Sequence, residues 1–169
     1  MTDLSRDGRS RDGDGASGGD AVPGEPAPSF AITASTGKVL SLDDFTGLVP
    51  VVLTFVGTLS PAAAEEVIAA YNDIFAEFGR QQVQLLIVTP ESESHVRTRR
   101  REGTTVPLLA DEDGTLLERF AASATFPATV VIDESGTVTR VLEGGSATDH
   151  VNAVRKVVTQ SSGGANSDR

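Results

Sequence analysis

The sequence predicts an α/β domain with a central mixed β-sheet, helices on both faces of the sheet, and a β-hairpin extension on its N-terminal side. Apolar runs rich in β-branched residues alternate with amphipathic stretches, and a tight turn joins the last two strand candidates. A chain of 169 residues is long enough for one domain with a buried core, and too short for two of ordinary size.

Both ends of the chain have the composition of disordered tails. Residues 1–24 are mostly Gly, Asp, Arg and Ser, and residues 161–169 are equally poor in apolar side chains. Such segments bury too little apolar surface to offset the entropy lost on ordering. We therefore expect a tail over 1–24, a single domain over 25–160 and a second tail over 161–169.

The domain opens with a hairpin, in which Ser29–Thr33 and Lys38–Leu40 flank a turn at Thr36-Gly37. Ser41 then begins a short helical turn, SLDDF. Pro50–Val56 (PVVLTFV) is a continuous apolar run, which is typical of a strand buried on both faces.

A long amphipathic helix follows this strand. Ser60 is a favoured N-cap and Pro61 a favoured first helical residue, so the start is well defined. Gly79 is expected to end the helix. Its apolar residues fall on one face at helical spacing: Val67, Ile68, Tyr71, Ile74, Phe75 and Phe78.

The rest of the chain continues the alternation and closes with a helix whose Val151, Val154, Val157 and Val158 share one face. Two βα units, a β-hairpin and this closing helix together predict a mixed sheet with helices on both faces. The expected elements are a strand Gln82–Val88, a helix Glu91–Glu102, an extended piece Val106–Leu109, a helix Thr115–Ala122, a strand Pro127–Asp133, a turn Glu134–Thr137, a strand Val138–Leu142 and a helix Thr148–Thr159.

Charge and composition exclude several classes of partner. A formal net charge of −10 argues against a general affinity for nucleic acid or for anionic membranes. The chain begins without the apolar core of a signal peptide, and no apolar run approaches the roughly 20 residues of a membrane span. We expect a cytoplasmic protein without membrane insertion.

Three longer strings occur in a characteristic order: GEPAPSFAITASTGKVLSLDDFTG, LLADEDGTLLERFAAS and TFPATVVIDESGTV. Through them the chain, from about Gly24 to Val158, resembles the thioredoxin-fold redoxin families. These include the peroxiredoxin-like AhpC/TSA proteins and the TlpA-like thiol-disulfide reductases. The resemblance implies a thioredoxin-like fold and a cis peptide bond between Phe126 and Pro127.

The string FVGTLSPAAAEEV covers the segment that carries the redox site in those families, where it reads F-x-x-x-x-C-P-x-C-x-E-E. Ser60 stands at the position of the attacking cysteine and Ala63 at that of the resolving cysteine. Pro61, Glu65 and Glu66 match the pattern. The resemblance therefore implies a degenerate site at Ser60, Pro61 and Ala63.

A second alignment, to one-cysteine peroxiredoxins, places the lost thiol at Pro61 or Ala64 instead. The conclusion is the same, because the chain contains no cysteine. A serine hydroxyl is far too weak an acid to replace a thiolate near pH 7, and it forms neither a mixed disulfide nor a sulfenic acid. Cysteine-based disulfide reduction and peroxidase activity are therefore excluded.

Other catalytic or binding interpretations of the sequence are weak. Ser60 would need a nearby base to act as a nucleophile, and we expect His95 and His150 on the surface, away from it. Asp111-Glu112-Asp113-Gly114 lacks the downstream ligands of a calcium loop, so a turn before a helix is favoured. The arginines of one helix could bind an anion, but a solvated face balanced by glutamates is favoured: Arg97, Arg99, Arg100 and Arg101. No metal and no cofactor are predicted.

The resemblance also implies a groove, between the loop of the attacking residue and the cis-proline loop, that receives extended peptide. The leading hypothesis is a redox-inactive module that binds an unidentified peptide or protein partner there. One alternative is an oxidoreductase by lineage only, and another is a different enzyme that uses Ser60 or a bound metal. The residues expected to line the groove are Gly57, Thr58, Leu59, Ser60, Phe126 and Pro127.

Overall fold

The computed structural model describes residues 21–57, 59–121 and 124–156. Most of both expected tails, and residues 157–159 of the closing helix, lie outside this range. In the described chain β1 pairs with β2, and a separate five-stranded sheet has the order β5-β4-β3-β6-β7. The strands are β1 (Ala31–Thr33), β2 (Val39–Ser41), β3 (Val51–Phe55), β4 (Gln84–Thr89), β5 (Leu108–Ala110), β6 (Ala128–Ile132) and β7 (Val138–Glu143).

The central sheet is mixed, as expected. β3 runs parallel to β4, and β4 parallel to β5. β6 runs antiparallel to both of its neighbours, β3 and β7. Phe55, the last residue of β3, lies opposite Val88 on one side and Ala128 on the other. The carboxyl end of β3 therefore meets the beginning of β6, and the two halves of the expected groove come together there.

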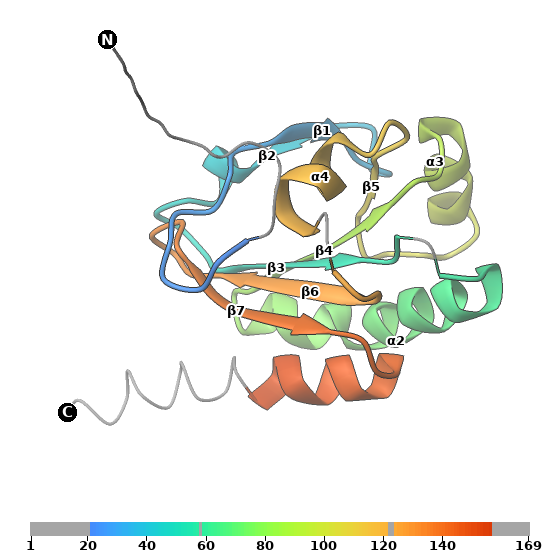
Figure 1. Cartoon of the computed structure of the whole chain (residues 1–169). Helices are drawn as coiled ribbons and strands as arrows, with labels where there is room; N and C mark the ends of the chain where they lie inside the picture. Colours follow the sequence, from blue (N-terminus) through green and yellow to red (C-terminus); the bar gives the residue numbers. More distant parts are fainter. Residues whose placement is uncertain (1–20, 58, 122–123, 157–169) are drawn as a thin grey trace, which may run out of the picture.

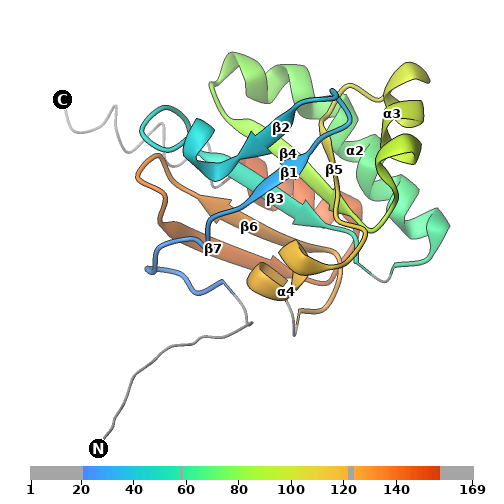
Figure 2. The same cartoon turned by 90° about the horizontal axis from the view of Figure 1, so that it is seen from above.

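Helices cover both faces of the sheet. Figure 1 shows α4 (Thr115–Ala121) and the β1–β2 hairpin on one face, with α2 (Pro61–Arg80) and the helical residues 147–156 on the other. Figure 2 shows the hairpin and α4 together on the near side of the sheet. α3 (Glu93–Arg101) connects β4 to β5, and a 3-10 turn, η1 (Leu42–Asp44), follows the hairpin. Among the described residues, every helix is too short or too polar to cross a lipid bilayer.

Alternate residues of β3 point into two separate cores, because successive strand side chains face opposite sides of a sheet. Val51, Leu53 and Phe55 belong to the core beneath the hairpin and α4, which we call the upper core. Val52 and Val56 belong to the core facing α2, which we call the lower core. All five residues of β3 are buried, as the apolar run predicts.

The apolar face predicted for α2 is confirmed, but its predicted end is wrong. The face packs on the lower core with all of its predicted members except Phe75 fully buried. The helix continues through Gly79 to Arg80, and the left-handed conformation occurs later, at Gln82, where φ is 60°. The Val83 N–H bonds to the Phe78 carbonyl at 3.0 Å, so the chain reverses only after the last buried residue of the helix.

The start of the described chain is held against the domain. Ala21 is buried in the upper core, and its N–H donates to the Phe120 carbonyl at 2.8 Å. The Gly24 N–H donates to the Val138 carbonyl at 2.7 Å, at the beginning of β7. Residues 21–24, which their composition assigned to the tail, therefore pack on α4 and β7. Composition does not predict this contact, because it depends on one small apolar side chain and on backbone hydrogen bonds, which any residue except proline can donate.

Candidate functional site

The position expected for the attacking residue is the first turn of α2. Ser60 is the N-cap, and its hydroxyl accepts a hydrogen bond from the Ala63 N–H at 3.3 Å. Pro61 is the first helical residue, where its missing N–H costs nothing. Ser60 is exposed, and among the described residues no hydrogen bond joins it to a histidine. Its geometry is that of a structural cap.

The opposite wall of the site is the cis-proline segment, Thr125–Pro127. The Phe126–Pro127 peptide bond is cis, as the resemblance implies. Phe55 of β3 pairs with Ala128 of β6, so continuing the antiparallel register places Gly57 opposite Phe126. The structure thus brings these two predicted groove residues together.

Gly57 and Phe126 are in direct contact. Gly57 has a φ of +51°, and a Cβ atom placed there would lie 2.6 Å from the Phe126 ring. No side chain fits between the backbone of Gly57 and that ring. Glycine is therefore required both by the left-handed conformation and by the close approach of the aromatic ring.

The other predicted groove residues continue from this contact. Leu59 is half-buried against the lower core, and its N–H closes a turn onto the Val56 carbonyl at 3.0 Å. Pro127, the last residue of the cis-proline segment, is buried. Thr58 lies outside the described residues. We refer to residues 57–60 as the 57–60 loop.

A cavity of about 270 Å³ opens beside Gly57 at the carboxyl ends of β3 and β4. Phe55, Val88 and Leu117 supply apolar walls, and the turn of residues 111–114 closes one side. This hollow, which we call the β3–β4 cavity, adds an apolar space next to the contact between Gly57 and Phe126. Sequence reasoning missed it, because its walls come from segments far apart in the chain.

Glu65, one of the two glutamates that match the redoxin pattern, is tied to α3. Arg99 pairs with Glu65 of α2, and its guanidinium donates two hydrogen bonds to Glu91, at 2.8 and 2.7 Å. The Glu91 hydrogen bonds, with a smaller contribution from Glu65, raise the pKa of Arg99 above its usual value. The arginine side chain is only 16% exposed. It therefore departs from the solvated face expected for this cluster and braces α3 against α2.

The two histidines differ from one another. His95 is exposed, as predicted, but the surface location predicted for His150 is wrong, since it is 2% exposed. Its Nδ1 lies 2.8 Å from the hydroxyl of Thr129, and its Nε2 lies 2.6 Å from the carbonyl oxygen of Gly144. Both ring nitrogens are occupied, so His150 is not placed to act as a base for Ser60.

His150 belongs to a buried polar cluster that sequence reasoning missed. The Thr129 hydroxyl also lies 2.9 Å from the Thr54 hydroxyl and 3.2 Å from the Tyr71 hydroxyl. Thr54 and Thr129 face each other across β3 and β6, while Tyr71 comes from α2. Burial raises the pKa of Tyr71, and its hydrogen bond to Thr129 only partly opposes this rise, so the phenol keeps its proton. We call these four residues the hydroxyl–imidazole cluster.

The acidic turn before α4 caps that helix, as the favoured interpretation has it. The Asp111 carboxylate is buried and accepts hydrogen bonds from the Leu116 and Leu117 N–H groups, both at 3.0 Å. Asp113 accepts from the Thr115 N–H at 3.1 Å, and that bond lowers the pKa of Asp113. These oxygens therefore satisfy backbone donors. Among the described residues, no three His, Asp or Glu side chains are grouped so as to hold a metal ion.

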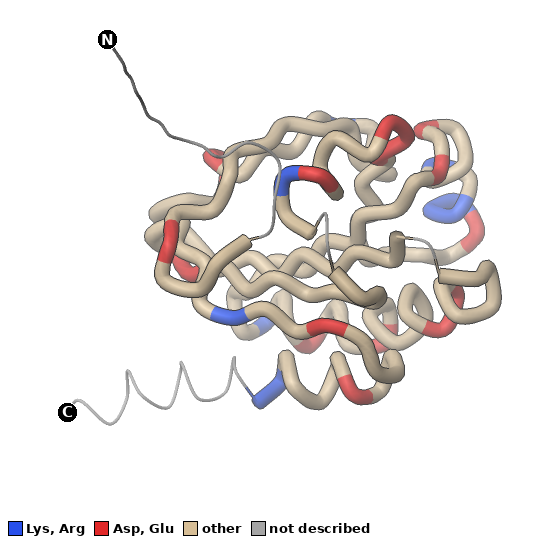
Figure 3. The backbone as a smooth tube through the Cα atoms, in the orientation of Figure 1, with Lys and Arg blue, Asp and Glu red and all other residues tan. Residues whose placement is uncertain are grey.

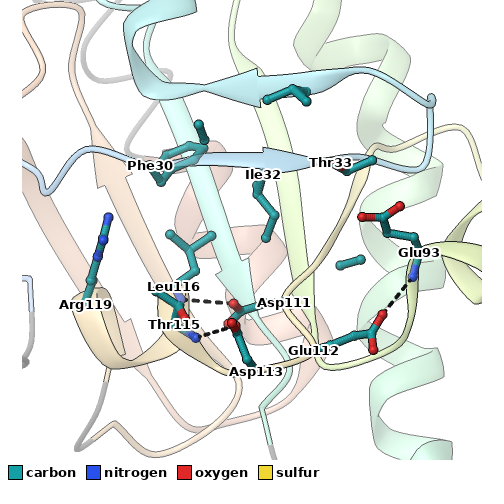
Figure 4. A pocket seen from close by; sticks show the side chains of 13 residues that line it. Phe30, Ile32, Thr33, Glu93, Asp111, Glu112, Asp113, Thr115, Leu116 and Arg119 are labelled. Atoms are coloured by element: carbon teal, nitrogen blue, oxygen red, sulfur yellow. Dashed lines mark hydrogen bonds between the residues drawn. The ribbon is translucent and has the colours of Figure 1, made fainter.

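The same turn separates the β3–β4 cavity from a larger one of about 490 Å³, shown in Figure 4. The hairpin lines this second cavity with Phe30 and Ile32, and Arg119 lies at one side. Arg119 donates to the Ser29 carbonyl at 2.8 Å, and Glu112 accepts from the Glu93 N–H at 3.3 Å. Figure 3 shows acidic residues mainly on the helices and turns, and basic residues at several separate places that include α3, α4 and β7.

Comparison with known proteins adds a family and several relatives. A model of the AhpC/TSA family matches residues 23–141. A Mycobacterium tuberculosis protein named "Putative peroxiredoxin" is 25% identical over 147 residues, which cover 80% of this chain and 93% of the relative. Among solved structures, Xanthomonas campestris peroxiredoxin Q is 21% identical, with a TM-score of 0.71, and the match covers 84% of this chain and 98% of that one.

A further solved structure agrees on the fold. Peroxidoxin BcpB of Mycobacterium tuberculosis is 20% identical, with a TM-score of 0.68, and the match covers 83% of this chain and 97% of that one. At these identities the solved structures establish the thioredoxin-like fold. The sequence match to the family model covers most of the described domain, including the 57–60 loop and the cis-proline segment.

Proposed function

Because the chain belongs to the AhpC/TSA family and contains no cysteine, we propose that it is a redox-inactive thioredoxin-fold module that binds an extended peptide or protein segment. The binding site is the groove between the 57–60 loop and the cis-proline segment. Thiol chemistry at this groove is excluded, since no residue of the chain can form the required thiolate. Recognition of an extended segment requires no thiol.

The contact between Gly57 and the Phe126 ring carries this proposal. The ring lies against bare backbone and is itself only partly buried, so one aromatic side chain of the cis-proline wall offers apolar surface where the two walls meet. Half-buried Leu59 adds apolar surface on one side. Partly exposed aromatic residues in concave surfaces are frequent anchors of binding energy.

The backbone around Phe126 supports pairing with an extended partner. The Gly144 N–H donates to the carbonyl oxygens of both Thr125 and Pro127, at 3.0 and 2.9 Å. In the part of the chain that the structure describes, no hydrogen bond occupies the N–H or the carbonyl of Phe126 itself. A strand laid along the segment would pair with these groups, as in β-augmentation.

Substitutions in the two walls test the proposal. A phage-displayed heptapeptide library is selected on the purified full chain, and the affinity of an enriched peptide is measured by fluorescence anisotropy. Phe126→Ala is expected to weaken binding about tenfold or more, because it removes the aromatic ring of the cis-proline wall. Leu59→Asp is expected to have a similar effect, because it places a charge on the apolar wall.

Leu48→Asp is the matched control. Leu48 is 70% exposed and precedes β3, at the end of that strand opposite to the groove, so binding should not change. Unchanged binding in both Phe126→Ala and Leu59→Asp would remove the groove as the site. A library that enriches no peptide on the wild-type chain would argue against the binding function itself.

A further inference from the structure

The hydroxyl–imidazole cluster lies on the side of the lower core, and its His150 contacts Gly144, a residue that is hydrogen-bonded to the cis-proline segment. His150 is held in the first turns of the helical residues 147–156, where the Asp149 carboxylate accepts from the Ser146 N–H and the Ser146 hydroxyl accepts from the Asp149 N–H. This reciprocal cap fixes the start of the helix and, with it, the place of the imidazole ring.

Hydrogen-bond chemistry determines which group donates along the cluster. The Gly144 carbonyl can only accept, so His150 Nε2 carries the proton of the 2.6 Å contact. In a neutral ring Nδ1 then accepts, and the Thr129 hydroxyl donates to it. The Thr129 oxygen has two lone pairs left for the hydroxyls of Thr54 and Tyr71. Every buried donor of the cluster thus has an acceptor.

Gly144 connects His150 to the cis-proline segment. Its carbonyl accepts the hydrogen bond from His150, and its N–H donates to the carbonyls of Thr125 and Pro127. Its φ is +73°, and a Cβ atom there would lie 3.3 Å from Thr125, so the position favours glycine and the turn packs closely on Thr125. The Thr125 N–H is also held, by the Glu143 carboxylate at 3.0 Å.

We propose that His150 is a positioning residue for the groove: through Gly144 it holds the Phe126–Pro127 wall in its position against Gly57. The inference rests on the proposed function for its biological meaning. The structural role itself does not depend on binding: one imidazole N–H holds the Gly144 turn, and that turn holds both residues that flank Phe126.

Two variants of similar polarity separate this role from simple packing. The amide nitrogen of Gln reaches the place of Nε2, whereas the shorter Asn reaches only the place of Nδ1. His150→Gln should therefore keep the bond to Gly144, and His150→Asn should lose it. Val154→Ala is the control, because Val154 is fully buried on the same helix and makes no hydrogen bond through its side chain.

The readout is amide hydrogen exchange of Gly144, measured by NMR and compared with Leu86 of the central strand β4. His150→Asn should speed Gly144 exchange, relative to Leu86, by about tenfold or more, because the amide then opens locally. The NOE between the Phe126 ring and the Gly57 α-protons should weaken in parallel. His150→Gln and Val154→Ala should stay within about threefold of the wild type in the same ratio. Equal Gly144 protection in the Asn and Gln variants would overturn the proposal.

The wild-type protein gives a second test that does not depend on the folding of any variant. The Nε2–H of His150 should give a slowly exchanging imidazole resonance with an NOE to the residues around Gly144. A rapidly exchanging or undetectable Nε2–H would contradict the positioning role.

Peptide binding then separates the two proposals. With the phage-selected peptide, His150→Asn should weaken affinity about threefold to tenfold, and His150→Gln should not. If the wild type binds no peptide, the proposed function fails while the exchange data still decide the positioning role. If the wild type binds and both variants bind equally well, the positioning role fails while the proposed function stands.

Discussion

Ser60→Cys is expected to give this chain a thiol whose pKa lies clearly below that of an ordinary cysteine. The serine hydroxyl already accepts the Ala63 N–H at the start of α2, and a thiolate would accept the same bond at the positive end of the helix dipole. Cysteines at helix N-termini have pKa values of about 3.5 to 7.5, against about 8.5 for a free thiol. At pH 7 the ionised fraction should rise from about 3% to about 25% or more.

The thiolate absorbance at 240 nm, followed against pH, gives this pKa directly. Ala76→Cys is the matched control on the same helix, because Ala76 is exposed, lies far from the N-terminus of α2, and has Asp73 and Arg80, of opposite charge, about one turn away on either side. In the Ser60→Cys variant, hydrogen peroxide should also oxidise the introduced thiol to a sulfenic acid that dimedone traps. If the thiols of the two variants titrate at the same pH, the N-terminus of α2 does not provide the activating environment argued for it.

Thr129→Val is expected to lower the free energy of unfolding by about 2–4 kcal/mol. Valine has nearly the same shape as threonine but removes the hydroxyl that joins Thr54, Tyr71 and His150. Buried polar groups that lose their partners bear the desolvation cost without compensation, and this substitution affects three of them at once. Urea denaturation measures the loss, provided that the slope of the transition stays the same.

Thr54→Val provides the comparison within the same cluster. Thr54 is also fully buried, and it faces Thr129 in the sheet. It makes one hydrogen bond to Thr129 and none to His150. Its loss should cost about 1 kcal/mol. A Thr129→Val cost no larger than that of Thr54→Val would show that the cluster is not organised around Thr129.

The parts of the fold that local patterns encode could be predicted from the sequence. PVVLTFV predicts a strand buried on both faces, and the apolar face of α2 follows from helical spacing. The prediction that α2 ends at Gly79 was wrong, because the helix extends past the buried Phe78 to Arg80 and the chain turns at Gln82. Tertiary packing, rather than the propensity of one residue, decided that boundary.

The hydroxyl–imidazole cluster shows why the rest of the site was missed. Its members are spread over two strands and two helices, and side-chain bonds between distant segments leave no periodic pattern. A signal for His150 was nonetheless present, since it lies next to Val151 and four residues before Val154, both on the predicted buried face. Threonines inside otherwise apolar strands are a second signal, because a buried hydroxyl needs a partner.

The residues of the degenerate site could be predicted from the sequence, but the contacts around them could not. Ser60 as the N-cap and the cis bond before Pro127 followed from the pattern and from the redoxin resemblance. The ion pair of Arg99 with Glu65, and the β3–β4 cavity, depend on how α3 and the turn before α4 pack in three dimensions.

A thiol-coupled peroxidase assay on the purified wild-type chain tests the central claim most directly. Hydrogen peroxide and a small dithiol are supplied together, and peroxide consumption is compared with that of a heat-denatured sample of the same protein. We expect identical rates in the two samples, because the chain carries no sulfur nucleophile. Peroxide turnover by the native chain above that control would contradict the account.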